Sequence, residues 1–201
     1  MATENAVLMK MARESLKGKW GLAIGTSVVY LLIILALQMI PFVGWIASLV
    51  ISGPMALGFA AFWLSLSRNQ ETKLELLFGG FNRFGTAFVA YLLMTIFTLL
   101  WMLLLIIPGI IAAYSYAMTY YIIIDDNSIS ASEAIKKSKK MMNGNKMKLF
   151  YLSCRFIGWI LLCSFTFGIG YLWLIPYMQL SFAKFYEDIK NNQSVAEIAK
   201  S

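Results

Sequence analysis

The chain alternates long apolar runs with short charged segments. Residues 20–67, 84–124 and 156–183 contain no Asp, Glu, Lys or Arg. As a helix, the first run would extend about 72 Å, more than twice the roughly 30 Å hydrocarbon core of a bilayer. It must therefore fold back on itself, and so must the second run. The third run can do the same if its helices continue on both sides, so the pattern predicts three helical hairpins.

Proline and glycine divide these runs, because both residues interrupt regular helices. The first turn is expected at residues 40–44, the second at Pro108-Gly109 and the third at residues 167–170. The expected spans are residues 20–40, 43–67, 84–107 and 110–124, and two helices that begin near 148 and end near 189. The expected breaks in the hairpins are Pro41, Pro108, Gly109, Gly168, Gly170 and Pro176.

Composition indicates that these helices lie in a membrane. Of the 201 residues, 13% are charged and 60% are hydrophobic, and the mean hydropathy is +0.70, whereas a soluble domain has about 25% charged residues. We expect an all-α fold, a polytopic membrane helical bundle of about six transmembrane helices with short amphipathic interfacial helices. The chain is expected to form a single membrane domain, residues 1–201, with hairpin units at roughly 1–68, 69–127 and 128–201.

The charged residues predict the orientation. All 17 Lys and Arg residues and all 10 acidic residues fall in segments 1–19, 68–83, 125–155 and 184–201. Lys and Arg accumulate in the cytoplasmic loops of membrane proteins. The N-terminus, the C-terminus and both long loops are therefore predicted to be cytoplasmic.

A short amphipathic segment precedes each hairpin, with charged residues on one face and apolar residues on the other. The basic faces consist of Lys136, Lys137, Lys139 and Lys140 in segment 132–142, and of Lys10, Arg13 and Lys17 in segment 4–17. The apolar faces consist of Ala134, Ile135, Met141 and Met142 in the last segment, Val7, Leu8, Met11 and Ala12 in the first, and Leu74, Leu77, Phe78 and Phe81 in the middle one.

Two of these segments begin with the pattern of a capping box, in which a Ser or Thr and a Glu three residues later satisfy backbone amides of the first helical turn. The patterns are Thr72-x-x-Glu75 and Ser130-x-x-Glu133. Thr3 is a candidate cap for the first segment, although Ala6 stands where the glutamate would be.

The second helices of the first and third hairpins resemble each other. Residues 54–63 read Pro-Met-x-Leu-x-Phe-Ala-x-Phe-Trp, and residues 176–186 read Pro-x-Met-x-Leu-x-Phe-Ala-x-Phe-Tyr. With one residue inserted, the two segments align. This suggests that a unit of one interfacial helix and one hairpin occurs three times, with the weakest support in the middle copy.

Two interpretations of the basic faces stay open. Either the lysines anchor and orient the protein at anionic headgroups, at about 1 kcal/mol each, or they form a platform that recruits a particular anionic lipid or an anionic partner. No recognised nucleic-acid-binding module accompanies the charge, so nucleic acid is not an expected partner.

The sequence offers no candidate catalytic residue, metal site or cofactor site. Histidine is absent, which removes the commonest general base and metal ligand, and Cys154 and Cys163 lack zinc-site spacing. Asp125 ends the fourth predicted span and is interpreted as a solvated helix end. Gln38 and five tyrosines either line a polar cavity or join helices by hydrogen bonds; these tyrosines are Tyr91, Tyr114, Tyr116, Tyr120 and Tyr121.

Several segments resemble one family of bacterial membrane proteins. Residues 99–111 read Leu-Leu-Trp-Met-Leu-Leu-Leu-Ile-Ile-Pro-Gly-Ile-Ile, residues 168–178 read Gly-Ile-Gly-x-Leu-Trp-x-Ile-Pro-Tyr-Met, and residues 81–85 read Phe-x-Arg-Phe-Gly. These segments are similar to the family labelled domain of unknown function 975. The resemblance implies a polytopic protein of the bacterial cytoplasmic membrane, and it supplies no catalytic residue or substrate.

We therefore expect a non-enzymatic membrane scaffold or accessory protein that engages anionic lipid or a partner through its cytoplasmic basic helices. Its expected partners are membrane lipids, and a membrane-protein partner or a second copy of the chain is a further candidate. The alternative is a small transporter for a lipid or another apolar molecule, and an enzyme ranks third. A transporter needs a cavity lined by polar groups, whereas a scaffold is expected to be packed to its axis.

Overall fold

The computed structural model describes residues 3–40, 43–166 and 168–198, and every regular element in these ranges is a helix. In chain order the elements are α1 (Asn5–Leu16), α2 (Trp20–Gln38), α3 (Val43–Ser67), the 3₁₀ helix η1 (Leu74–Arg83), α4 (Phe84–Leu104), α5 (Ile106–Tyr116), α6 (Thr119–Asp125), α7 (Ala131–Met141), α8 (Lys146–Phe165) and α9 (Tyr171–Ile198). Five stretches are long and apolar enough to span a membrane: Trp20–Gln38, Ile46–Ser67, Leu74–Leu104, Ile106–Asp125 and Lys146–Phe165. The expected all-α membrane fold class is confirmed.

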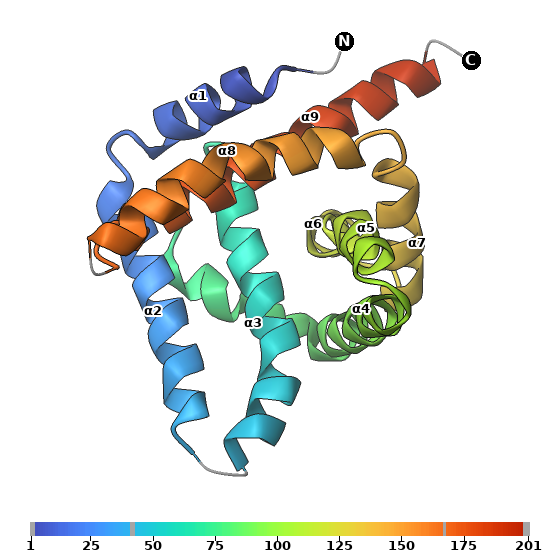
Figure 1. Ribbon diagram of the computed structural model, residues 1–201, viewed down its shortest axis with the longest axis horizontal. Coiled ribbons are helices and arrows are strands. Elements are labelled where there is room, and N and C mark those ends of the chain that lie inside the picture. The colour runs from blue at the N-terminus through green and yellow to red at the C-terminus, as the bar shows by residue number, and fades with distance from the viewer. Residues whose placement is uncertain (1–2, 41–42, 167, 199–201) are drawn as a thin grey trace.

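The long helices pair as three hairpins, α2–α3, α4–α5 and α8–α9, which point in different directions (Figure 1). In this view α2–α3 extends downward, α8–α9 crosses the upper part, and α4 and α5 are seen nearly end-on. The buried core lies where the hairpins converge. Near the tips the apolar side chains are exposed, and Met39, Leu103 and Phe165 are each 84% exposed.

Each short helix packs on another hairpin or on the helix that follows it. η1 packs on α3, α7 packs on α6, and α1 packs on α9, beside which it lies in Figure 1. The helix before a hairpin thus covers the hairpin that precedes it in the chain, and α1 covers the last one. These three contacts close a ring.

The buried stripe of α1 differs from the predicted apolar face. Leu8, Ala12 and Leu16 are buried against the protein, while Val7 and Met11 are 44% and 40% exposed. Residues four apart lie above one another on an α-helix, so these three buried residues form one narrow stripe. This stripe is covered mainly by α9, whereas Val7 and Met11 of the predicted apolar face stay exposed.

In the middle segment, the structure buries Leu77 and Gly80 and leaves Phe78 and Phe81 exposed. The predicted face contained both phenylalanines, because it assumed 3.6 residues per turn. The segment is instead a 3₁₀ helix, in which residues three apart share a face. The predicted apolar face is therefore divided between one residue that packs on the protein and two that stay exposed.

One of the two predicted capping boxes forms. At the start of α7, Ser130 Oγ accepts a hydrogen bond from the Glu133 amide at 3.4 Å, and Glu133 Oε2 accepts one from the Ser130 amide at 3.1 Å. The pattern at Thr72 and Glu75 forms no such box, because η1 begins at Leu74, with Lys73 as its N-cap and no side-chain hydrogen bond at the cap.

The second hairpin turns earlier than predicted. Its break is Leu105, whose backbone is extended between the end of α4 and the start of α5. Pro108 lies in the first turn of α5, where a missing amide hydrogen is tolerated. Gly109 lies within α5 and permits a close approach, since a Cβ there would be 2.9 Å from Met102 Cα in α4.

The other predicted breaks have different outcomes. Gly168, with a φ of +87°, lies in the turn between α8 and α9, and so does Gly170, where a Cβ would stand 2.6 Å from Cys163 Sγ. Pro176 breaks no helix and lies inside α9, so that prediction is corrected. Pro41 lies outside the described residues.

The fourth predicted span is interrupted between α5 and α6. Ser138 of α7 stabilises the interruption, because its hydroxyl donates to the Ser115 carbonyl at 2.9 Å and accepts from the Met118 amide at 3.3 Å. Both backbone groups lie where the helical ladder is broken. Arg83 stabilises the end of α6 by donating to three backbone carbonyls in residues 123–129.

Candidate functional site

The lysines predicted on α7 form one exposed face. Lys136, Lys137, Lys139 and Lys140 are all exposed, and the buried residues of the same helix are Ala131, Ala134, Ile135, Ser138 and Met141. The basic face therefore points away from the rest of the protein, and the apolar face is covered by the second hairpin.

Most of this face borders a hollow at the end of α7. Lys136, Lys139, Lys140 and Lys146 line the hollow together with Asn143, and its volume is about 390 Å³. Within the described part of the chain, none of these lysines forms an ion pair with a carboxylate. Four ammonium groups thus share a small surface region without local neutralisation.

The basic residues predicted on α1 lie elsewhere. Lys10, Arg13 and Lys17 are exposed, but α1 lies beside α9 at the top of Figure 1, while α7 is at the right-hand side. The structure therefore does not combine the two basic faces into one surface.

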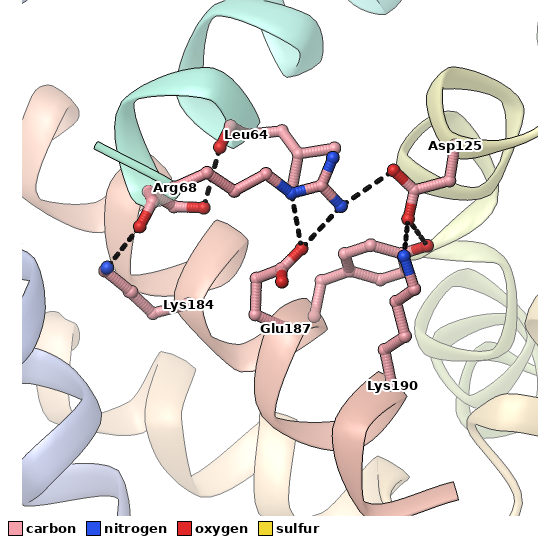
Figure 2. A network of polar contacts seen from close by, with 8 residues as sticks. Leu64, Arg68, Asp125, Lys184, Glu187 and Lys190 are labelled. Atoms are coloured by element: carbon pink, nitrogen blue, oxygen red, sulfur yellow. Dashed lines mark hydrogen bonds and ion pairs between the residues drawn. The ribbon is translucent and has the colours of Figure 1, made fainter. Parts of the chain in front are cut away.

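A group of four charged side chains and one tyrosine joins the three hairpins where they converge. We define the charged junction as Arg68, Asp125, Tyr186, Glu187 and Lys190 (Figure 2). Arg68 Nη2 donates to Asp125 Oδ1 and to Glu187 Oε1, both at 2.7 Å. Tyr186 and Lys190 donate to the other carboxylate oxygen of Asp125.

Each hairpin supplies a member of the charged junction. Arg68 follows the end of α3, Asp125 ends α6, and the remaining three residues belong to α9. Asp125 was predicted to be a solvated helix end, and this was wrong, because three donors surround its carboxylate. The sequence contains no local signal for the contact, since Arg68 and Asp125 are 57 residues apart.

A second ionic contact connects the first residues of the described chain to α8 and α9. Asp188 forms an ion pair with Lys148 and accepts hydrogen bonds from the backbone and the side chain of Thr3. Thr3 thus bonds to α9 and does not cap α1, whose N-cap is Glu4.

These contacts lower the pKa of the Asp188 carboxyl. Burial alone would raise its pKa, but the hydrogen bonds from Lys148 and Thr3 outweigh burial and hold the pKa below its ordinary value. The stabilisation from this carboxylate is therefore present above its ordinary pKa and is lost as the pH falls through the lowered value.

A cavity of about 370 Å³ lies between the three hairpins. Residues of α2, α3, α5, α6, α8 and α9 line it, among them Tyr30, Phe59, Leu149 and Phe182. The volume falls within the range of about 300–1,000 Å³ typical of small-molecule sites. The cavity is only partly enclosed, and its walls are mostly apolar.

The polar groups of this central cavity are few. Tyr120 Oη is buried and has no hydrogen-bond partner in the described chain, and Ser153 and Gln179 also line the cavity. Of the six residues considered for a polar cavity, Tyr114, Tyr120 and Tyr121 line this one, and Tyr91 and Tyr116 line a neighbouring groove. Gln38 lines neither space.

The charged junction lies directly behind the wall of the central cavity. The ring of Tyr121, which lines the cavity, stacks on the ring of Tyr186 with centroids 5.1 Å apart. The hydroxyl of Tyr186 then donates to Asp125 at 2.8 Å. The rings of Tyr121 and Tyr186 thus separate the cavity from Asp125 of the charged junction.

Comparison with known proteins identifies a family. A family model described as "Protein of unknown function (DUF975)" matches residues 1–112 and 102–193. No curated protein and no solved structure matches the chain. Within the ranges that the structure describes, no group of three or more Cys, Asp or Glu side chains is arranged to hold a metal ion.

Proposed function

The chain belongs to this family of unknown function, and we propose that it is a non-enzymatic scaffold or accessory protein of the bacterial cytoplasmic membrane. In this proposal it binds anionic lipid headgroups through the basic face of α7. The observation that carries the proposal is the exposure of Lys136, Lys137, Lys139 and Lys140 on a helix whose other face is buried.

Electrostatics supports this assignment. A lysine near an anionic membrane surface contributes about 1 kcal/mol of attraction. The hollow bordered by Lys136, Lys139, Lys140 and Lys146 offers several ammonium groups to one phosphate-bearing headgroup. An anionic segment of a membrane-protein partner, or of a second copy of the chain, would use the same contacts.

Changing Lys136, Lys139 and Lys140 together to Gln is expected to reduce the retention of phosphatidylglycerol by the purified protein. The measurement is native mass spectrometry of protein released gently from vesicles of phosphatidylethanolamine and phosphatidylglycerol. With three charges removed, a loss of about tenfold or more in phosphatidylglycerol occupancy is expected.

The matched control replaces the same three lysines by Arg, which keeps the charge on the same surface. This variant is expected to retain phosphatidylglycerol as the unaltered protein does. Equal retention of phosphatidylglycerol by the Gln and Arg variants would contradict the proposal. The lysines would then serve only to orient the protein in the membrane.

The proposed orientation predicts which cysteines react from outside the cell. In a background with Cys154→Ser and Cys163→Ala, single cysteines replacing Met39, Leu103 or Phe165 are expected to react with a membrane-impermeant maleimide in intact cells. These positions lie near the three tips, and each is 84% exposed.

A cysteine replacing Lys137, which is exposed on α7, is expected to react only after the cells are permeabilised. Ser138 is unsuitable for this comparison because it is buried and hydrogen-bonded. Labelling of Lys137→Cys in intact cells, without labelling at the tips, would refute the cytoplasmic assignment of the charged segments.

The central cavity favours one alternative, a transporter for a lipid or another apolar molecule. All three hairpins line the cavity, so a movement of one hairpin relative to the others would change its volume. Passage through the protein would also require the Tyr121–Tyr186 stack and the charged junction to separate. We rank this function second because the cavity walls are mostly apolar.

A further inference from the structure

A second apolar space borders the central cavity. A groove along α4 is lined by Tyr91, Met94 and Met102, among others, and it shares four lining residues with the cavity. The shared residues are Ala56, Ala113, Ala117 and Tyr120. The two spaces thus border the same four residues, and we refer to the cavity and the groove together as the slot.

The slot reaches the lipid-facing surface. Leu99 and Met102, which line its groove, are 64% and 45% exposed and lie within the membrane span Leu74–Leu104. In the opposite direction the slot ends among Phe59, Tyr121 and Phe182, near the point where the hairpins converge. A molecule dissolved in the bilayer would thus meet the groove at the surface of α4, and the cavity lies beside the groove against the same four residues.

The lining chemistry limits what can occupy this slot. No charged side chain lines the cavity or the groove within the described ranges, and burying an unpaired charge there would be strongly unfavourable. The small side chains of Ala56, Ala113 and Ala117 leave room along its length. The polar groups that face it are uncharged, so at most a small uncharged polar group fits beside the apolar chain.

We propose that this slot binds a single acyl chain of a membrane lipid. An acyl chain is long, flexible and uncharged, and in a bilayer it is present at high concentration beside the exposed part of α4. Its binding buries apolar surface of Phe59, Tyr121 and Phe182 that would otherwise face empty space or water. This site is separate from the lysine face of α7, since the two have no lining residue in common.

The test uses full-length protein in vesicles of phosphatidylethanolamine and phosphatidylglycerol. The probe is a phosphatidylglycerol with a diazirine near the end of one acyl chain, and peptide mapping after illumination locates the adducts. We expect adducts at Phe59 and Phe182, which lie inside the slot, in addition to adducts on the exposed tips.

Ala113→Leu combined with Ala117→Leu is expected to reduce the adducts at Phe59 and Phe182 by about tenfold, because added methylene groups exclude a ligand from an apolar site. Both alanines are exposed to the slot, so the added atoms displace no packed side chain. Ala117→Leu alone is a milder second variant. The matched control is Ala36→Leu, on an exposed position of α2, which is expected to leave these adducts unchanged.

Two outcomes would overturn the proposal. The first is labelling confined to the exposed tips, and the second is equal internal labelling in the Leu variants and the control. Loss of the α7 lysines is expected to leave the internal adducts unchanged, so failure of the proposed headgroup site and failure of the acyl-chain site are distinguishable.

Discussion

Gly80→Ala is expected to lower the free energy of unfolding by about 1–3 kcal/mol, the usual effect of forcing extra volume into a packed contact. A Cβ at this position would lie 1.9 Å from the carbonyl oxygen of Pro54 and 2.7 Å from the amide nitrogen of Gly58. Both atoms belong to the backbone of α3, so only a movement of η1 away from α3 can relieve the clash. The measurement is equilibrium unfolding in mixed micelles with an increasing fraction of denaturing detergent.

The neighbouring glycine provides the control. At Gly79 a Cβ would meet no atom within 4 Å, and the residue lies in the same 3₁₀ helix. Gly79→Ala therefore has a similar effect on backbone entropy without the steric contact, and it is expected to be neutral or slightly stabilising. Equal destabilisation by the two substitutions would show that the η1–α3 contact does not depend on the missing side chain.

Arg68→Met is expected to destabilise the protein by about 2 kcal/mol. Exposed ion pairs contribute about 0–1 kcal/mol, whereas breaking a fully buried pair costs about 3–5 kcal/mol. The charged junction lies between these limits, because the side chains of Arg68, Asp125 and Glu187 are 27%, 14% and 24% exposed. Removing the guanidinium leaves the carboxylate of Glu187 without its ion pair and Asp125 with only Tyr186 and Lys190 as donors.

A double-mutant cycle separates this interaction from the loss of side-chain packing. Arg68→Met, Glu187→Gln and the double variant are compared by detergent unfolding, and a coupling energy of about 1 kcal/mol or more is expected. Lys73→Met is the control, since its contact with Glu71 is 3.5 Å long and both side chains are mostly exposed. Additive effects of Arg68→Met and Glu187→Gln would mean that the charged junction does not connect α3 to α9.

The sequence predicted the helices well where the deciding residues lie close together in the chain. The run of residues 20–67 predicted the first hairpin, and the Ser130–Glu133 pair predicted the start of α7, because capping involves atoms only three residues apart. The second hairpin was predicted less well. Pro108 is compatible with both a helix break and the first turn of a helix, and the sequence does not distinguish these two roles.

The residues of the candidate sites were predicted unevenly. The exposed lysines of α7 follow from helical periodicity, as does its buried face. Arg68 and Glu187 were not singled out, because surface charges next to apolar runs usually serve only orientation. Tyr120 was considered as a cavity residue, but the sequence could not show that its hydroxyl lacks a partner.

The sequence by itself determined that this protein is a membrane protein made of helical hairpins. Apolar runs of this length lie in the bilayer, where no water is available, and a helix satisfies the hydrogen bonds of their backbone N–H and C=O groups within each segment. The tertiary structure decided that the hairpins diverge, that η1 closes onto α3, and that Arg68 meets Asp125 beside an apolar cavity. Hydrophobicity and turn preferences act over a few residues, whereas Arg68 and Asp125 are 57 residues apart and the other contacts depend on how separate helices pack.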